Sequence, residues 1–138
     1  MRLQANEYLG RIKSALSSKL ETMTDRQQAE EHYYRALDLV ADGDQQKALE
    51  EYEKSLAADP AFTEAMHGKA RALQDLNRLD EAIAAAQRIA ELDPDDILAH
   101  TSLSVLFQKK GMIPEAEAEG NKARILGWKQ QLKKAPSD

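Results

Sequence analysis

The chain of 138 residues contains no cysteine, so disulfide bonds and thiolate metal sites are excluded. It also lacks any apolar run approaching the roughly 20 residues that a membrane-spanning helix needs. The N-terminus has no continuous apolar core followed by a small-residue cleavage site, so we predict no signal peptide. None of these absences reveals the compartment, and we take the cytoplasm as the expected location.

Positive charge is scarce in the body of the chain. Residues 25–120 hold ten basic and 21 acidic side chains, a net charge of −11, whereas residues 1–24 carry +2 and residues 121–138 carry +4. An acidic body disfavours nucleic acid, because neutralisation of phosphates dominates that affinity. We therefore expect no nucleic-acid partner. The basic ends are either solvated helix ends or contact sites for acidic partners or for the acidic body of another copy.

Catalytic signatures are absent from the sequence. There is no Ser–His–Asp order, phosphate-binding glycine loop or nucleophile elbow. His32, His67 and His100 fall in separate predicted helices. Helices pack about 8–10 Å apart, and three such helices hold these rings too far apart to share one metal ion. We predict no enzyme activity, no metal and no cofactor.

What the chain does contain is a repeat with a period of 34 residues. Asp59-Pro60 recurs as Asp93-Pro94, and Ala48 recurs at Ala82 and Ala116. The same spacing separates three predicted turn residues: Gly43, Asn77 and Gly111. A 34-residue period built from two helices is typical of a tetratricopeptide-type repeat.

Six helices are predicted after residue 24, in three pairs. Their expected ranges are 25–42, 45–58, 60–76, 79–92, 94–110 and 113–133. Thr24 followed by Gln27 fits a capping box, and Asp44 is placed to cap the second helix of the first pair. Asp59 is placed to cap the next helix, with Pro60 at its first position.

Residues 1–24 are predicted to form a separate amphipathic helix in front of a second domain, residues 25–138. Its apolar positions, at helical spacing, are Leu9, Ile12, Leu16, Leu20 and Met23. An isolated helix of this length is marginal in water. The stripe must therefore be buried, either on the first helix pair or on a second protein.

Residues 29–128 resemble the tetratricopeptide repeat (TPR) family. Small residues recur midway along each first helix and near the start of each second helix: Ala36, Ala70 and Ser104, then Ala48, Ala82 and Ala116. The departures from the family pattern include Ala86 and Gly120, which stand where an aromatic residue is common and are expected to leave gaps in the packing. The resemblance implies an all-α superhelix of three helix-turn-helix repeats with an extended C-terminal capping helix.

The resemblance also implies a binding site. In TPR proteins the first helices line a concave groove that binds a peptide or helix of a partner protein. Carried over position by position, the groove exposes Tyr33, Leu37, His67, Arg71, Leu98, Thr101 and Val105. The lysine and asparagine clamp of chaperone-binding members finds no match here, so we expect no binding of chaperone tails through that clamp.

Two functions remain open. The first is a non-enzymatic adaptor that binds a protein or peptide partner in the groove. The second is a scaffold that self-assembles, for example as a homodimer, through the N-terminal stripe or through Trp128. That residue is the only tryptophan and stands where the earlier copies have proline. It is either a packing cap for the last repeat or an exposed anchor, since tryptophan is favoured at interface hot spots.

Overall fold

The computed structural model describes residues 7–13 and 23–134, and these residues form helices joined by short turns. Residues 7–13 are one short helix. Six helices follow: α2 (Asp25–Ala41), α3 (Gln45–Ala58), α4 (Thr63–Asp75), α5 (Leu79–Leu92), α6 (Ile97–Lys109) and α7 (Ile113–Lys134). No strand occurs in the described ranges. The predicted all-α class is confirmed.

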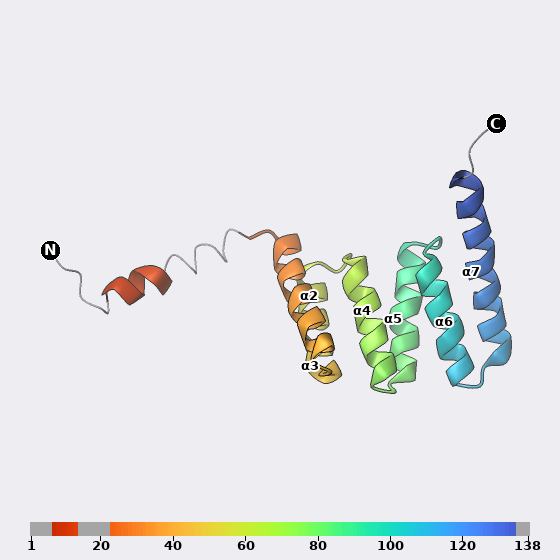
Figure 1. Cartoon of the computed structure of the whole chain (residues 1–138), viewed down its shortest axis with the longest axis horizontal. Helices are drawn as coiled ribbons and strands as arrows, with labels where there is room; N and C mark the ends of the chain where they lie inside the picture. The colour runs from red at the N-terminus through yellow and green to blue at the C-terminus, as the bar shows by residue number, and fades with distance from the viewer. Residues whose placement is uncertain (1–6, 14–22, 135–138) are drawn as a thin grey trace.

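The six helices form three pairs that stack side by side into a solenoid (Figure 1). α2 packs on α3, α4 on α5 and α6 on α7, while α3 also contacts α4 and α5 contacts α6. Each element therefore touches its neighbours in sequence, as expected of a repeat protein. This arrangement confirms the predicted helical-repeat architecture. No helix among the described residues is long and apolar enough to cross a membrane.

Local sequence signals fix the start of α2, the start of α3 and the three tight turns. Thr24 Oγ1 accepts the Gln27 N–H at 3.1 Å, and Gln27 Oε1 accepts the Thr24 N–H at 2.9 Å. Asp44 Oδ1 accepts the Lys47 N–H at 3.1 Å. Both predicted caps are confirmed. The three predicted turn residues all have left-handed backbones: Gly43 (φ +82°), Asn77 (φ +59°) and Gly111 (φ +75°).

Two helices begin later than predicted. α4 starts at Thr63 and α6 at Ile97, so Pro60 and Pro94 lie in the preceding turns rather than at a first helical position. Asp59 does not cap α4. Its carboxylate accepts the Ala61 N–H at 3.1 Å and closes the turn locally, which is a common use of aspartate.

Small residues bring the helices of each pair together. Ala36, Ala48, Ala82 and Ala86 are completely buried. The predicted gap at Ala86 is therefore closed by its neighbours. At Gly120 an added Cβ would lie 3.2 Å from Ser104 Oγ, so the side chain of α6 occupies that space. The predicted close approach of the two helices in each pair is confirmed.

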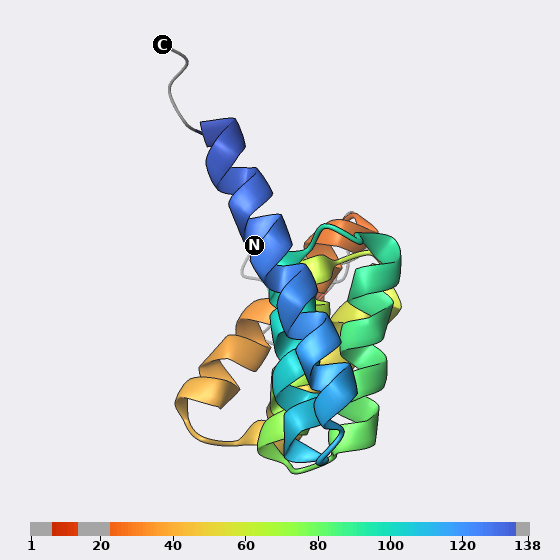
Figure 2. The same ribbon diagram turned by 90° about the vertical axis from the view of Figure 1, so that its right-hand side faces the viewer.

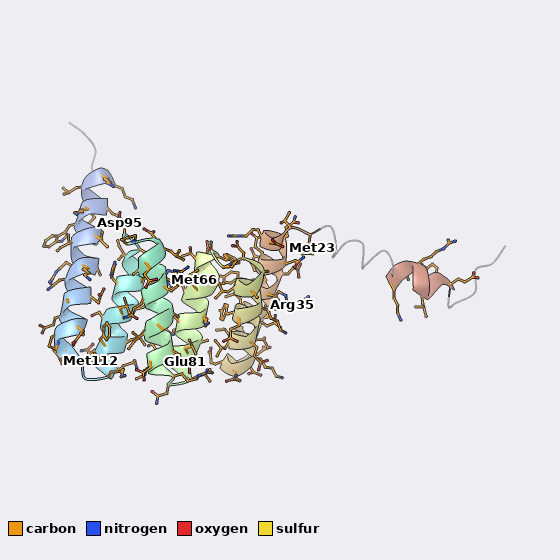
Figure 3. The ribbon with its side chains drawn as sticks, turned by 180° about the vertical axis from the view of Figure 1, so that it is seen from behind. Met23, Arg35, Met66, Glu81, Asp95 and Met112 are labelled. Carbon is orange, nitrogen blue, oxygen red and sulfur yellow. The ribbon has the colours of Figure 1, made fainter. Side chains whose placement is uncertain are left out.

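The two ends of the solenoid differ. At the N-terminal end, Arg35 lies at the edge of the array and pairs with Glu31 at 3.9 Å (Figure 3). At the C-terminal end, α7 is 22 residues long and continues through Gly127. Its second half extends beyond the other helices (Figures 1 and 2). The outermost helix at one end, α2, carries both charged and exposed apolar side chains, and the other end presents a protruding helix.

Candidate functional site

A depression of 210 Å³ lies between the first helices of the second and third pairs. Its lining residues are His67, Ala70, Arg71, Gln74, Leu98, Ser102 and Leu106. His67, Arg71 and Gln74 recur at helical spacing, so one face of α4 supplies them. Leu98 and Ser102 come from one face of α6 for the same reason. The site is a small pocket between two first helices, α4 and α6.

The structure brings three of the seven predicted groove residues together in this depression: His67, Arg71 and Leu98. Leu37, Thr101 and Val105 are exposed on first helices but do not line it. Tyr33 is half-buried. The predicted set is therefore distributed over the first helices, and only its centre forms one pocket.

Charged partners fix the centre of the depression. His67 Nε2 lies 3.0 Å from Asp96 Oδ2, and the other oxygen of Asp96 accepts the Ala99 N–H at the start of α6. This aspartate therefore links the N-terminus of α6 to α4. Arg71 pairs with Asp75 at 3.3 Å, yet its side chain stays 73% exposed. The guanidinium group is free to meet a ligand.

An aromatic cluster on the first pair was not predicted from the sequence. The Tyr33 ring lies 5.2 Å from Phe62, 5.6 Å from Tyr34 and 6.1 Å from Tyr52, measured between centroids. Arg26 stacks on Phe62 at 3.8 Å. Phe62 and Tyr52 are buried while Tyr34 is exposed. The clue was the concentration of aromatic residues between positions 33 and 62, in a chain with few of them.

A protein-family model described as "Tetratricopeptide repeat" matches residues 39–106. That segment spans two periods of the 34-residue repeat. Residues 39–106 are tetratricopeptide repeats. The TPR assignment agrees with the helix pairs and with the small residues between them. No curated protein matches the chain significantly.

Solved structures with the TPR fold superpose on the chain. The second TPR of Spaghetti (RPAP3), bound to the HSP90 peptide SRMEEVD, has a TM-score of 0.69 and 23% identity, covering 73% of this chain and 94% of that one. MamA has a TM-score of 0.72 and 21% identity, covering 75% and 60%. The Yersinia enterocolitica type III secretion translocator chaperone SycD, an alternative dimer, has 0.68 and 20%, covering 71% and 74%. These likenesses establish the fold.

A cavity of 670 Å³ lies between the second and third helix pairs. Its lining residues are Gln87, Ala90, Glu91, Pro94, His100, Leu103, Glu119, Lys122, Ile125 and Leu126. A second cavity, of 440 Å³, lies one period earlier, and its residues Leu56, Pro60 and Met66 correspond to Ala90, Pro94 and His100. Packing of TPR pairs thus leaves a groove at each junction.

His100, which lines the 670 Å³ cavity, is a buried polar residue that is only 7% exposed. Its Nδ1 lies 2.7 Å from Glu119 Oε2, and its Nε2 lies 2.7 Å from the Pro94 carbonyl. Both neighbours are acceptors, and the protonated ring, which donates from both nitrogens, can satisfy both of them. Burial alone lowers the pKa of His100, but these hydrogen bonds outweigh it and raise the pKa above 6.5.

The same arrangement occurs in the first pair. His32 Nδ1 lies 2.7 Å from Glu51 Oε2, and Lys54 lies 3.2 Å from the other oxygen of Glu51. Burial raises the pKa of Glu51 and of Glu119, but in both cases hydrogen bonds from histidine and lysine prevail and the pKa is lowered. Recurrence of this contact within two helix pairs indicates that it links the two helices of a pair. No cluster of three metal-ligating residues occurs in the described ranges.

The residues predicted to support self-assembly are exposed where the structure describes them. Leu9 and Ile12 both lie uncovered on the helix of residues 7–13. Leu16 and Leu20 lie outside the described residues. Trp128 is 61% exposed, so it is not a packing cap for the last pair. α7 continues beyond the ends of the other helices, and Trp128 lies on this protruding part, where its ring is in solvent.

Proposed function

We propose that this TPR chain is a non-enzymatic interaction module of the cytoplasm, and that its first helices bind a helix or peptide of a partner protein. The observation that carries the proposal is the apolar surface of these helices. Exposed large apolar residues there are Tyr34, Leu37 and Val40 on α2 and Leu98 and Val105 on α6. Exposed apolar patches of this kind mark interaction sites.

The chemistry of the depression narrows the ligand. Apolar residues lie on both outer helices, and Arg71 stands between them on α4 with most of its side chain in solvent. An extended or helical segment whose apolar side chains are spaced widely enough to reach both α2 and α6 can contact both sides. One acidic group on that helix can pair with Arg71. RPAP3, which shares the fold, is described bound to a peptide.

Selection of a helical peptide library on the immobilised chain tests this proposal. The enriched peptide is then titrated against purified variants. Leu37→Glu and Arg71→Glu are expected to weaken its binding by tenfold or more, about 1.4 kcal/mol. Leu92→Glu is the matched control, because Leu92 is also exposed but belongs to a second helix, α5. Equal binding by all variants, each folded by circular dichroism, would refute the groove.

A self-assembling scaffold is the second candidate, favoured by one observation. The second half of α7 presents Ile125, Trp128 and Leu132 to solvent. Large apolar side chains gathered on one protruding helix are costly unless something covers them. We propose that assembly through this face, rather than partner binding alone, belongs to the function of the chain.

A further inference from the structure

The second half of α7 carries an apolar stripe with basic flanks. Ile125, Trp128 and Leu132 recur at i, i+3 and i+7, and Trp128 and Leu132 are 61% and 76% exposed. Residues 121–134 contain five cations and no acidic side chain. By helical register, Lys122, Lys129 and Lys133 lie along one edge of the stripe, and Arg124 lies along the other.

Apart from Ile125, which lines the cavity beside His100 and Leu103, this stripe is not covered by the first helices of its own chain. α7 is continuous from Ile113 to Lys134 and packs on α6 through its first half. Its second half points away from the array (Figures 1 and 2). A continuous helix does not fold back on the solenoid that holds it. The cover must come from another molecule.

The first helices offer a surface of complementary chemistry. On α2, Glu30, Tyr34, Leu37 and Asp38 recur at i, i+4, i+7 and i+8 and share one face. Arg26 pairs with Glu30 at 3.1 Å, and Asp38 is an exposed acid beside the apolar residues. The surrounding residues 25–120 carry a net charge of −11. A basic helix with apolar anchors fits an acidic apolar surface in both respects.

We propose that the α2 end of the groove of one copy, which carries Leu37 and Asp38 and lies on another helix than Arg71, binds the basic half of α7, residues 121–134, from a second copy. This inference rests on the proposed groove and names its ligand. Pairing of α7 with its twin is disfavoured, because five cations would face five cations. An anionic lipid surface would repel the acidic body to which α7 is rigidly joined.

The geometry of such a contact allows assembly to continue beyond two copies. The groove and α7 are different surfaces, so the contact is heterologous, and each bound copy presents a further free α7. The mass should therefore rise continuously with concentration rather than stop at a dimer.

Trp128 provides a direct probe, because it is the only tryptophan in the chain. We expect its fluorescence maximum to shift to the blue as protein concentration rises, together with the average mass from sedimentation equilibrium. Leu37→Glu should abolish both changes. Trp128→Ala should abolish the rise in mass. Leu92→Glu is the control and should behave as the wild type. Should Leu37→Glu unfold, Tyr34→Glu tests the same surface at another exposed position.

Mixing the two defective variants distinguishes groove binding from pairing of like surfaces. Leu37→Glu keeps an intact α7 and its tryptophan, while Trp128→Ala keeps an intact groove and has no tryptophan. We expect the mixture to recover the blue shift and to stop at the mass of two chains. A blue shift with concentration in Leu37→Glu alone would show that α7 pairs elsewhere and would overturn the inference.

Two further results separate this inference from the groove itself. A wild type that stays monomeric at every concentration, yet binds the library-selected peptide, overturns the α7 assignment and leaves the groove standing. A chain that neither assembles nor binds the peptide loses both. A blue shift that needs phosphatidylserine–phosphatidylcholine vesicles would assign α7 to lipid and overturn the inference.

Discussion

Among the glycines of the chain, Gly68 is the one with least room for a side chain. A Cβ built there would lie 2.3 Å from the ring of Tyr52, which is buried beside Tyr33. The ring cannot move without disturbing the aromatic cluster. We expect Gly68→Ala to lower the free energy of unfolding by about 1–3 kcal/mol, as overpacking does. Urea unfolding of the purified variant measures the change.

Gly127 supplies the matched control. It lies inside α7 with nothing within 4 Å of the position a Cβ would take. Alanine favours a helix interior over glycine, so Gly127→Ala should raise stability by up to about 1 kcal/mol. The same substitution thus changes sign between two helical glycines. Equal effects at both sites would show that Tyr52 does not limit Gly68.

The pair of His100 and Glu119 makes stability depend on pH in a defined window. The raised pKa of His100 contributes stability below 6.5 that is lost as the pH rises through the higher folded-state value. The lowered pKa of Glu119, which also faces Lys122 at 3.1 Å, contributes stability above 4.5 that is lost as the pH falls. The joint contribution is largest between 4.5 and 6.5.

His100→Met isolates this contribution, because the second pair has Met66 at the equivalent position. Urea unfolding of the wild type should give a higher stability at pH 6 than at about pH 8. The variant should lose most of that difference. A variant with the wild-type pH profile would show that other groups govern it.

At the residue level, the sequence predicted the buried positions that recur at a fixed spacing. The burial of Ala36, Ala48 and Ala82 could be predicted from the 34-residue period alone. Burial of His100 did not follow, because a histidine on a helix is compatible with surface or core. Its partner Glu119 lies on another helix, and only the recurrence of His32 with Glu51 in the same register could have indicated the pair.

The helices themselves were predicted to within a few residues, and the errors have one cause. Pro60 fits the first turn of a helix, but Asp59 uses its carboxylate to close the turn and so delays α4 to Thr63. Competition between two local uses of Asp59 is decided by the path of the chain between α3 and α4. The sequence does not specify that path at single-residue resolution.

The turn between α4 and α5 is the least relaxed of the three tight turns. Asn77 adopts φ +59°, a left-handed conformation, while the equivalent residues are glycines. Asparagine tolerates this region better than other non-glycine residues. We expect Asn77→Ala to destabilise the chain by about 1 kcal/mol and Asn77→Gly to be neutral or stabilising. Thermal unfolding of both variants tests the ranking.

At the scale of the whole molecule, charge is separated along the chain. The body is acidic, and the last half of α7 is basic. If the groove of one copy holds α7 of another, assembly must weaken as salt rises, because exposed charges are screened beyond about 8–10 Å at physiological ionic strength. Sedimentation equilibrium in increasing sodium chloride measures this. An average mass unaffected by salt would mean that the apolar stripe alone drives assembly.

At the scale of the whole molecule, the sequence predicted the solenoid more completely than the groove. The solenoid followed from the period, because each helix pair can bury its apolar face only on the next pair. The groove followed only in part. The sequence indicates that Leu37 and Leu98 belong to first helices, but the curvature that decides whether they meet depends on packing summed over every junction.

The middle pair, α4 with α5, is covered by neighbours on both sides, so it belongs to neither end of the solenoid. One further copy of residues 63–96 inserted after residue 96 would meet the same small-residue contacts and the same junctions. The number of helix pairs therefore sets the length of the solenoid as well as its binding surface. The length of the solenoid can be changed in steps of 34 residues while the first pair and the protruding basic helix keep their places at the two ends.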